Sequence, residues 1–196
     1  MRLVVNEFMS LDGVVQAPGG PDEDTDGGFA HGGWSHPYFD VDVMGAAITS
    51  QMSTVDALLF GRRTWQAMAG AWPERAGDPY ADQMNAIKKY VVSGTLTPAD
   101  LTWNNTSLLA ADSAVADIET MRSQDGGDLL IWGSSMLVSS LLTKGLVDVL
   151  HLMIEPILLG GGKSIFPADG MARPMKLVNS ETASTGVVLC TYHPAA

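Results

Sequence analysis

Residues 57–65 read ALLFGRRTW, and residues 128–135 read DLLIWGSS. In both stretches a short apolar run ends at a glycine and leads into a segment with helical spacing. A buried strand that feeds a helix leaves unpaired backbone N–H groups and the positive end of the helix dipole at the turn. Phosphate groups bind at such turns, so two of them predict a ligand with several separated phosphates, as in a dinucleotide.

Outward from these stretches, apolar strands alternate with helices of about ten residues, which is typical of an α/β fold with a mainly parallel sheet. The last strands have no helices between them, so we expect them to form an antiparallel pair. No internal repeat or linker is visible, and we expect one domain over residues 1–196. The expected strands are residues 3–9, 57–61, 89–92, 107–110, 128–132, 147–159 and 186–193; the expected helices are a segment starting at Pro37, one starting at Thr64, residues 80–87, a segment capped at residues 112–113, and residues 134–143.

Charge and composition limit the possible partners. The chain has 22 acidic and 11 basic residues, a net charge of −11, and 46% hydrophobic residues. This balance suits a globular domain and argues against nucleic acid or an anionic membrane as a partner. Glu7 interrupts the first apolar run too early for a signal peptide, and no apolar run approaches the roughly 20 residues of a membrane helix. We therefore expect a cytoplasmic location.

The residues that commonly bind metals do not form a convincing site. Cys190 is the sole cysteine and lies in a strand pattern, so we expect a buried thiol. Asp22, Asp24 and Asp26 match the opening of a calcium-binding loop, but glycine stands where that loop needs a glutamate. His31 and His36 have no third ligand at a suitable spacing, so no metal is expected.

The Arg62–Arg63 pair is the strongest single indication of function. A cation at a helix N-terminus opposes the helix dipole by several tenths of a kcal/mol, so two of them favour a bound anion. The alternative is a solvated helix start. In an open α/β sheet, ligands bind beyond the carboxyl ends of the strands, and Ser93-Gly94 follows another strand at that edge. The three turns together predict a cofactor groove.

The order of the motifs resembles the dihydrofolate reductase superfamily, and more closely its branch with the reductase domain of riboflavin biosynthesis. The resemblance spans nearly the whole chain and implies a three-layer dihydrofolate reductase-like fold. The matching segments are SLDG at residues 10–13, GRRTW at 61–65, WGSS at 132–135, GLVD at 145–148, EPILLGGG at 155–162 and IFP at 165–167.

The resemblance implies NADPH as the cofactor and a homodimer as the assembly. Arg62 would meet the 2′-phosphate, and Arg63 and Thr64 would support the phosphates. The nicotinamide would lie near the end of the first strand and the Gly133 turn. The implied cofactor-binding residues are Phe8, Gly61, Arg62, Arg63, Thr64, Ser93, Gly94, Gly133, Ser134 and Ser135.

The substrate would lie beneath a glycine-rich segment, residues 19–34, that is expected to act as a lid. Asp40 is the nearest match to the acid of dihydrofolate reductases, although a carboxylate that merely favours a helix start is an equal alternative. Lys163 is a candidate for contacting a substrate phosphate. The candidate substrate-binding residues are Ser10, Trp34, Phe39 and Lys163.

These inferences predict an NADPH-dependent reductase of a small heterocyclic substrate. The most similar activity is 5-amino-6-(5-phosphoribosylamino)uracil reductase of riboflavin biosynthesis, or a stand-alone reductase with a different substrate. One alternative is a dihydrofolate or pterin reductase. An alternative of another class is a non-catalytic nucleotide- or protein-binding module on the same fold.

Overall fold

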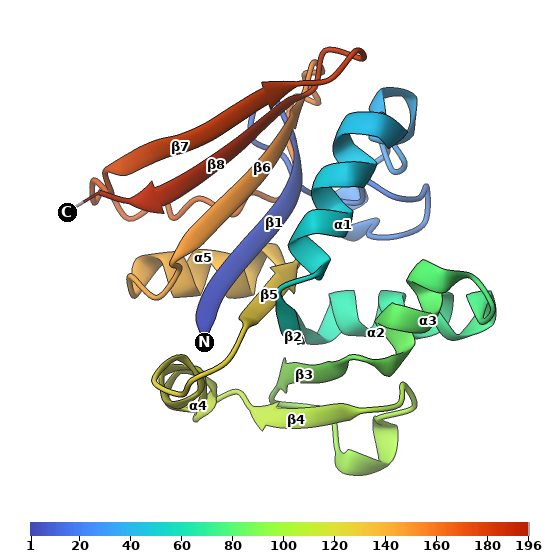
Figure 1. Ribbon diagram of the computed structural model, residues 1–196, viewed down its shortest axis with the longest axis vertical. Helices are drawn as coiled ribbons and strands as arrows, with labels where there is room; N and C mark the ends of the chain where they lie inside the picture. The colour runs from blue at the N-terminus through green and yellow to red at the C-terminus, as the bar shows by residue number, and fades with distance from the viewer. Residues whose placement is uncertain (196) are drawn as a thin grey trace.

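An eight-stranded sheet in the order β4-β3-β2-β5-β1-β6-β8-β7 runs through the computed structural model, which describes residues 1–195 (Figure 1). The strands β1 to β6 pair in parallel, whereas β8 pairs antiparallel with both β6 and β7. The predicted mainly parallel sheet with antiparallel C-terminal strands is therefore confirmed. The strands are β1 Arg2–Ser10, β2 Val55–Gly61, β3 Lys88–Ser93, β4 Thr106–Ala110, β5 Asp128–Trp132, β6 Val149–Glu155, β7 Met175–Thr182 and β8 Val188–Pro194.

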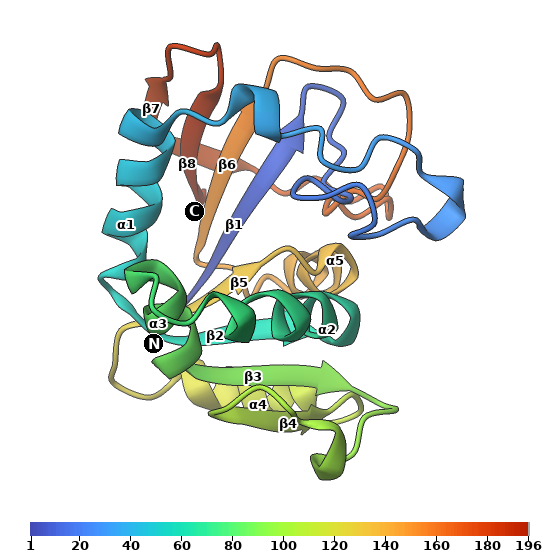
Figure 2. The same ribbon diagram turned by 90° about the vertical axis from the view of Figure 1, so that its right-hand side faces the viewer.

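Helices cover both faces of the sheet and complete three layers. The side chains of α4 and α5 pack on one face, and those of α1, α2 and α3 pack on the other. Figure 2 shows α1 and α5 on opposite sides of β1. Among residues 1–195, no helix has the length and apolar character needed to cross a membrane. The helices are α1 Ala46–Met52, α2 Arg62–Ala71, α3 Pro79–Ala86, α4 Ala114–Arg122 and α5 Ser135–Thr143.

The two stretches that opened the sequence analysis form the centre of the sheet. Leu58, Leu59 and Phe60 of β2 are fully buried, and so is the apolar run of residues 129–131 in β5. A strand buried on both faces has an unbroken apolar sequence rather than an alternating one. That property made both strands visible in the sequence, and each leads directly into a helix as predicted.

Two strands differ from the prediction. The edge strand β7 was not predicted, because all its residues after Met175 are exposed and the strand has no apolar face to reveal it. The strand expected over residues 147–159 ends at Glu155, since the following Pro156 has no N–H group for the sheet.

The first helix begins later than expected. Residues 36–38 form a single 3₁₀ turn, and the helical path starts after Asp40 with a π-type turn, Val41–Gly45, that continues into α1. The glycine-rich segment, residues 19–34, precedes this turn. Its last residue, Trp34, is only 6% exposed, and its indole N–H donates to the Gln16 carbonyl at 2.7 Å. The segment is therefore anchored to the domain at Trp34.

Candidate functional site

The candidate cofactor residues lie at one edge of the sheet. Because β1, β2, β3, β5 and β6 are parallel neighbours, their carboxyl ends meet at that edge. The turns after β3, β2 and β5 follow one another along it, in the order in which these strands stand in the sheet. Phe8, near the end of β1, stacks on Trp132 at the end of β5 with ring centroids 6.3 Å apart. The structure thus brings the predicted groove residues together.

The turns after β2 and β5 are clamped to each other. The Gly61 N–H donates to Ser134 Oγ at 2.9 Å, and the Ser134 N–H donates to Thr64 Oγ1 at 3.1 Å. Gly133 has a φ of +67°, and a Cβ there would lie 3.1 Å from Thr64 Cγ2. Only glycine fits this approach without strain. The hydroxyls predicted to hold phosphate also hold the two turns together, and each keeps its own O–H for a ligand.

Neither helix that starts at these turns is capped by a side chain. Gly61 is the N-cap of α2 and Ser134 is the N-cap of α5, and neither makes a side-chain capping bond. The first-turn N–H groups of both helices are thus left for another acceptor, which matches the needs of a pyrophosphate. Ser93 has a different task, since its hydroxyl accepts the N–H groups of Thr95 and Leu96 at 3.0 Å and shapes the turn after β3.

The two arginines of α2 differ in their partners. Arg62 donates to Gln66 one turn further along the helix at 3.1 Å, a neutral partner that leaves its charge uncompensated by this bond. Arg63 forms an ion pair with Asp26, with NH1 2.5 Å from Oδ2. Asp26 belongs to the glycine-rich segment, so this segment reaches across to the arginine pair. The hydrogen bond to Asp26 raises the pKa of Arg63.

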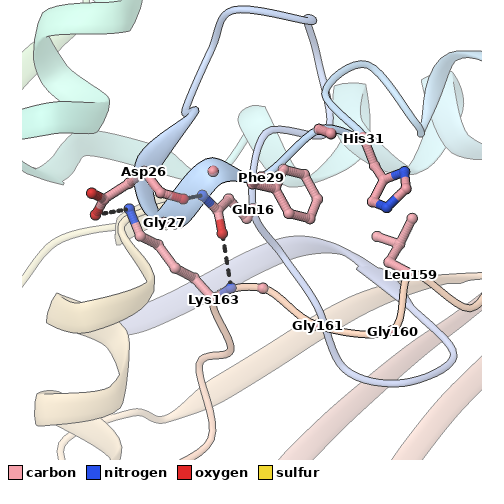
Figure 3. A pocket seen from close by; sticks show the side chains of 12 residues that line it. Gln16, Asp26, Gly27, Phe29, His31, Leu159, Gly160, Gly161 and Lys163 are labelled. Atoms are coloured by element: carbon pink, nitrogen blue, oxygen red, sulfur yellow. Dashed lines mark hydrogen bonds and ion pairs between the residues drawn. The ribbon is translucent and has the colours of Figure 1, made fainter.

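A cavity of about 660 Å³ lies between the glycine-rich segment and the turn after β6 (Figure 3). Lys163 stands at its border, and its Nζ lies 2.6 Å from Asp24 Oδ2 and 3.0 Å from Asp26 Oδ2. The Gln16 amide bonds the backbone of the same segment and accepts the Lys163 N–H at 3.1 Å. The lining residues are Gln16, 26–31 and 159–163.

His31 lines this cavity and packs edge-on against Phe29, with ring centroids 5.5 Å apart. Throughout residues 1–195, no three histidine, cysteine, aspartate or glutamate side chains are grouped closely enough to hold a metal ion.

Three of the candidate substrate residues have clear local surroundings. Ser10 is buried, and its hydroxyl donates to Asp12 at 2.6 Å while it accepts the Val14 N–H at 2.9 Å, so it shapes the turn after β1. Trp34 is buried, and its indole N–H is bonded to the Gln16 carbonyl. Phe39 is 42% exposed and available for contact. Of these side chains, Phe39 is the one whose surface is open to a ligand.

For Asp40 the structure favours the alternative role, that of a helix start. One oxygen accepts the Val43 N–H at 3.0 Å, as in an N-cap. The other accepts the N–H and hydroxyl of Ser184, in the turn between β7 and β8, at 3.1 and 2.6 Å. The Ser184 hydroxyl, followed by the Val43 N–H, lowers the pKa of Asp40. A carboxylate held in its charged form is a poor proton donor.

Two buried carboxyl groups at the same edge were missed by the sequence analysis. Glu155 ends β6 and is fully buried; its Oε1 accepts the Ser35 hydroxyl at 2.6 Å, whereas Oε2 has no partner within the described chain. Burial raises its pKa to about 7. Glu7 of β1 is also buried with an unpaired Oε1, and burial raises its pKa well above the usual value, partly offset by the Gly133 N–H.

The signal for both residues was present in the sequence. Each is the one acidic residue of a mainly apolar, buried strand, a position where an ionised carboxylate is costly. On β1 and β6, Ser10 stands opposite Glu155 and Phe8 opposite Met153. Alternate residues of a strand share a face, so Glu155 lies on the α1 side of the sheet with Phe8 and Met153.

Comparison with known proteins agrees with this geometry. An uncharacterized protein of Bacillus subtilis (strain 168), YyaP, is 26% identical over 98% of this chain and 94% of its own length. A putative riboflavin biosynthesis protein from Shewanella sp. PV-4 superposes with a TM-score of 0.73 at 21% identity, over the whole of both chains. Dihydrofolate reductase from Enterococcus faecalis, solved with NADP(H), gives a TM-score of 0.61 at 16% identity, over 100% of this chain and 97% of its own.

The fold is therefore that of dihydrofolate reductase. Residues 2–189 match the family described as RibD C-terminal domain, which covers the three layers and the clamped turns alike. The chain belongs to the RibD C-terminal domain family.

Proposed function

We propose that this protein is an NADPH-dependent reductase of a small heterocyclic substrate. One observation carries the proposal: the clamped turns after β2 and β5 present two uncapped helix N-termini and an arginine pair at the edge of the sheet where the parallel strands end. Membership of the RibD C-terminal domain family supports it. The substrate class most consistent with that family is the phosphoribosylaminouracil type.

The residues at the edge fit the parts of the cofactor. The Arg62 guanidinium, bonded only to the neutral Gln66 amide, suits the 2′-phosphate, and the first turns of α2 and α5 suit the pyrophosphate. The Phe8–Trp132 stack would border the nicotinamide. When bound, NADPH supplies the hydride, and the chain supplies orientation and exclusion of water.

Reduction of a C=N or C=O bond also needs a proton, and we assign its storage to Glu155. Its carboxyl group lies on the α1 side of the sheet and is half protonated near pH 7. Ser35 donates to Oε1, which leaves the unpaired Oε2 as the atom that holds the proton. A pKa near the working pH suits an acid that must both give and regain a proton.

Titration with NADPH and NADH tests the proposal, with the fluorescence of the five tryptophans as the signal. We expect saturable binding of both, with NADPH the tighter ligand. Replacing Arg62 and Arg63 by alanine should weaken NADPH binding by about a hundredfold, since two charge-assisted phosphate contacts are lost.

The matched control replaces Lys144 and Lys176, two exposed cations outside the predicted groove, by alanine. This variant has the same net charge as the arginine variant and should bind NADPH as the wild type does. Absence of binding of either nucleotide would refute the proposal and favour a non-catalytic module.

A further inference from the structure

Two cations from distant parts of the chain converge on one carboxylate oxygen. Asp26 Oδ2 lies 2.5 Å from Arg63 NH1, at the start of α2, and 3.0 Å from Lys163 Nζ, in the turn after β6. Figure 3 shows the Lys163 side chain directed at Asp26 along the edge of the cavity. Two positive groups on a single oxygen are the arrangement that proteins use for phosphate oxygens.

Stability alone does not account for this arrangement. The side chains of Arg63 and Asp26 are 60% and 49% exposed, and ion pairs so open to water contribute little to folding. Lys163 already has a second acidic partner, Asp24, at 2.6 Å. The segment is also held through its backbone, because Gln16 Nε2 donates to the carbonyls of Asp24 and Asp26 at 3.0 Å each.

The turn that carries Lys163 is built to hold it in place. Gly162 has a φ of +146°, and a Cβ there would lie 2.6 Å from Val14 Cγ1 and 3.1 Å from Phe29. Glycine is required by this close approach. The adjoining cavity has room for the rest of a ligand whose charged group reaches the two cations.

We propose that Arg63 and Lys163 form a single site for a phosphate group of the ligand, and that Asp26 occupies this site as an internal substitute until the ligand arrives. The inference rests on the proposed function and extends it, since it joins a cofactor candidate and a substrate candidate in one anion site. A bound phosphate takes both cations and releases residues 24–29 from the arginine. Arg63, followed by Lys163, lowers the pKa of Asp26 to about 2, so Asp26 remains ionised and competes for both cations throughout the neutral range.

The test compares wild type with Asp26→Asn, which keeps the shape of the side chain and removes its charge. Inorganic pyrophosphate and NADPH are the two probes, titrated by calorimetry and tryptophan fluorescence. Asp26→Asn should bind pyrophosphate about tenfold more tightly than wild type. The control is Asp22→Asn, an exposed acid of the same segment outside this ion-pair cluster, which should change the affinity less than about twofold.

Adding Lys163→Ala to Asp26→Asn should abolish the gain, because one of the two cations is then missing. Equal pyrophosphate affinity of Asp26→Asn and wild type, with matching thermal unfolding curves, would overturn the inference. If Asp26→Asn binds pyrophosphate more tightly but neither protein binds NADPH, the anion site stands and the proposed cofactor is wrong. If both proteins bind NADPH and pyrophosphate equally well, the cofactor proposal stands and the role of Asp26 is refuted.

Discussion

Replacing Glu155 by glutamine should change how the stability of this protein depends on pH. The carboxyl group is fully buried, and its burial raises the pKa from 4.5 to about 7. Glutamine has nearly the same shape and can still accept the Ser35 hydroxyl, but it cannot ionise. The substitution therefore removes one titration and leaves the packing in place.

The sign follows from proton binding. Between pH 4.5 and 7 the folded protein keeps the proton on Glu155, whereas the unfolded chain has lost it. The free energy of unfolding contributed by this group is complete below pH 4.5, falls as the pH rises from there to about 7, and is constant at higher pH, where both states are ionised. The full shift corresponds to about 3 kcal/mol. Since the ionised form can relax toward water, we expect about 2 kcal/mol.

The assay is urea unfolding of wild type and Glu155→Gln at intervals from pH 5 to pH 8. The difference between the two free energies of unfolding should shift by about 2 kcal/mol in favour of the variant at the higher pH. Glu7, whose pKa is also raised, titrates in both proteins and cancels in the difference. Glu181→Gln, an exposed acid on β7, is the control and should follow wild type. A difference that stays constant with pH would refute the argument and with it the assignment of the proton to Glu155.

Three further substitutions test single contacts. Gly133→Ala should lower the free energy of unfolding by about 1–2 kcal/mol and weaken NADPH binding. A residue with a side chain is strained at the φ of +67° found here, and its Cβ would crowd Thr64. Unchanged urea unfolding would contradict the proposed clamp between the two turns. Asp40→Ala should cost about 1–2 kcal/mol through the lost N-cap yet leave the dissociation constant for NADPH within about twofold, as measured by tryptophan fluorescence. Trp34→Phe should cost about 1 kcal/mol and speed hydrogen exchange in residues 17–34, because the Gln16 carbonyl loses its donor; unaltered exchange would show that this bond does not anchor the segment.

The parts of the fold that could be predicted are those in which buried strands require a run of apolar residues. β2 and β5 are buried on both faces, and their apolar runs stand out between glycines and polar residues. β7 lies exposed at the edge of the sheet, so packing does not constrain its residues, and its sequence has no alternation of apolar and polar residues that would predict a strand. The start of the first helix was misplaced because Asp40, which caps it through the Val43 N–H, is held in place by Ser184, a residue 144 positions away.

The same reasoning applies to the site. Gly133 and the arginines of the turns were predictable from local signals, since a positive φ favours glycine and a cation at a helix start opposes the dipole unless an anion binds there. The bonds that Ser134 makes with Gly61 and Thr64 were not predictable, because they join turns that are about 70 residues apart in the sequence. The meeting of Asp26 with Arg63 and Lys163 was not predictable either, because it depends on how two loops fold back onto the start of α2.

The overall charge explains why a few cations matter so much here. A chain with a net charge of −11 repels an anionic ligand at long range, yet at physiological salt this field fades within about 8 Å. In the proposed site, the affinity for a polyphosphate would therefore depend on the cations that touch it, Arg62, Arg63 and Lys163. Arg63 and Lys163 are paired with acidic residues of the glycine-rich segment. A ligand of the proposed site would have to break those pairs to bind, so we expect the acids of the segment, rather than the net charge, to set the selectivity against weakly charged anions.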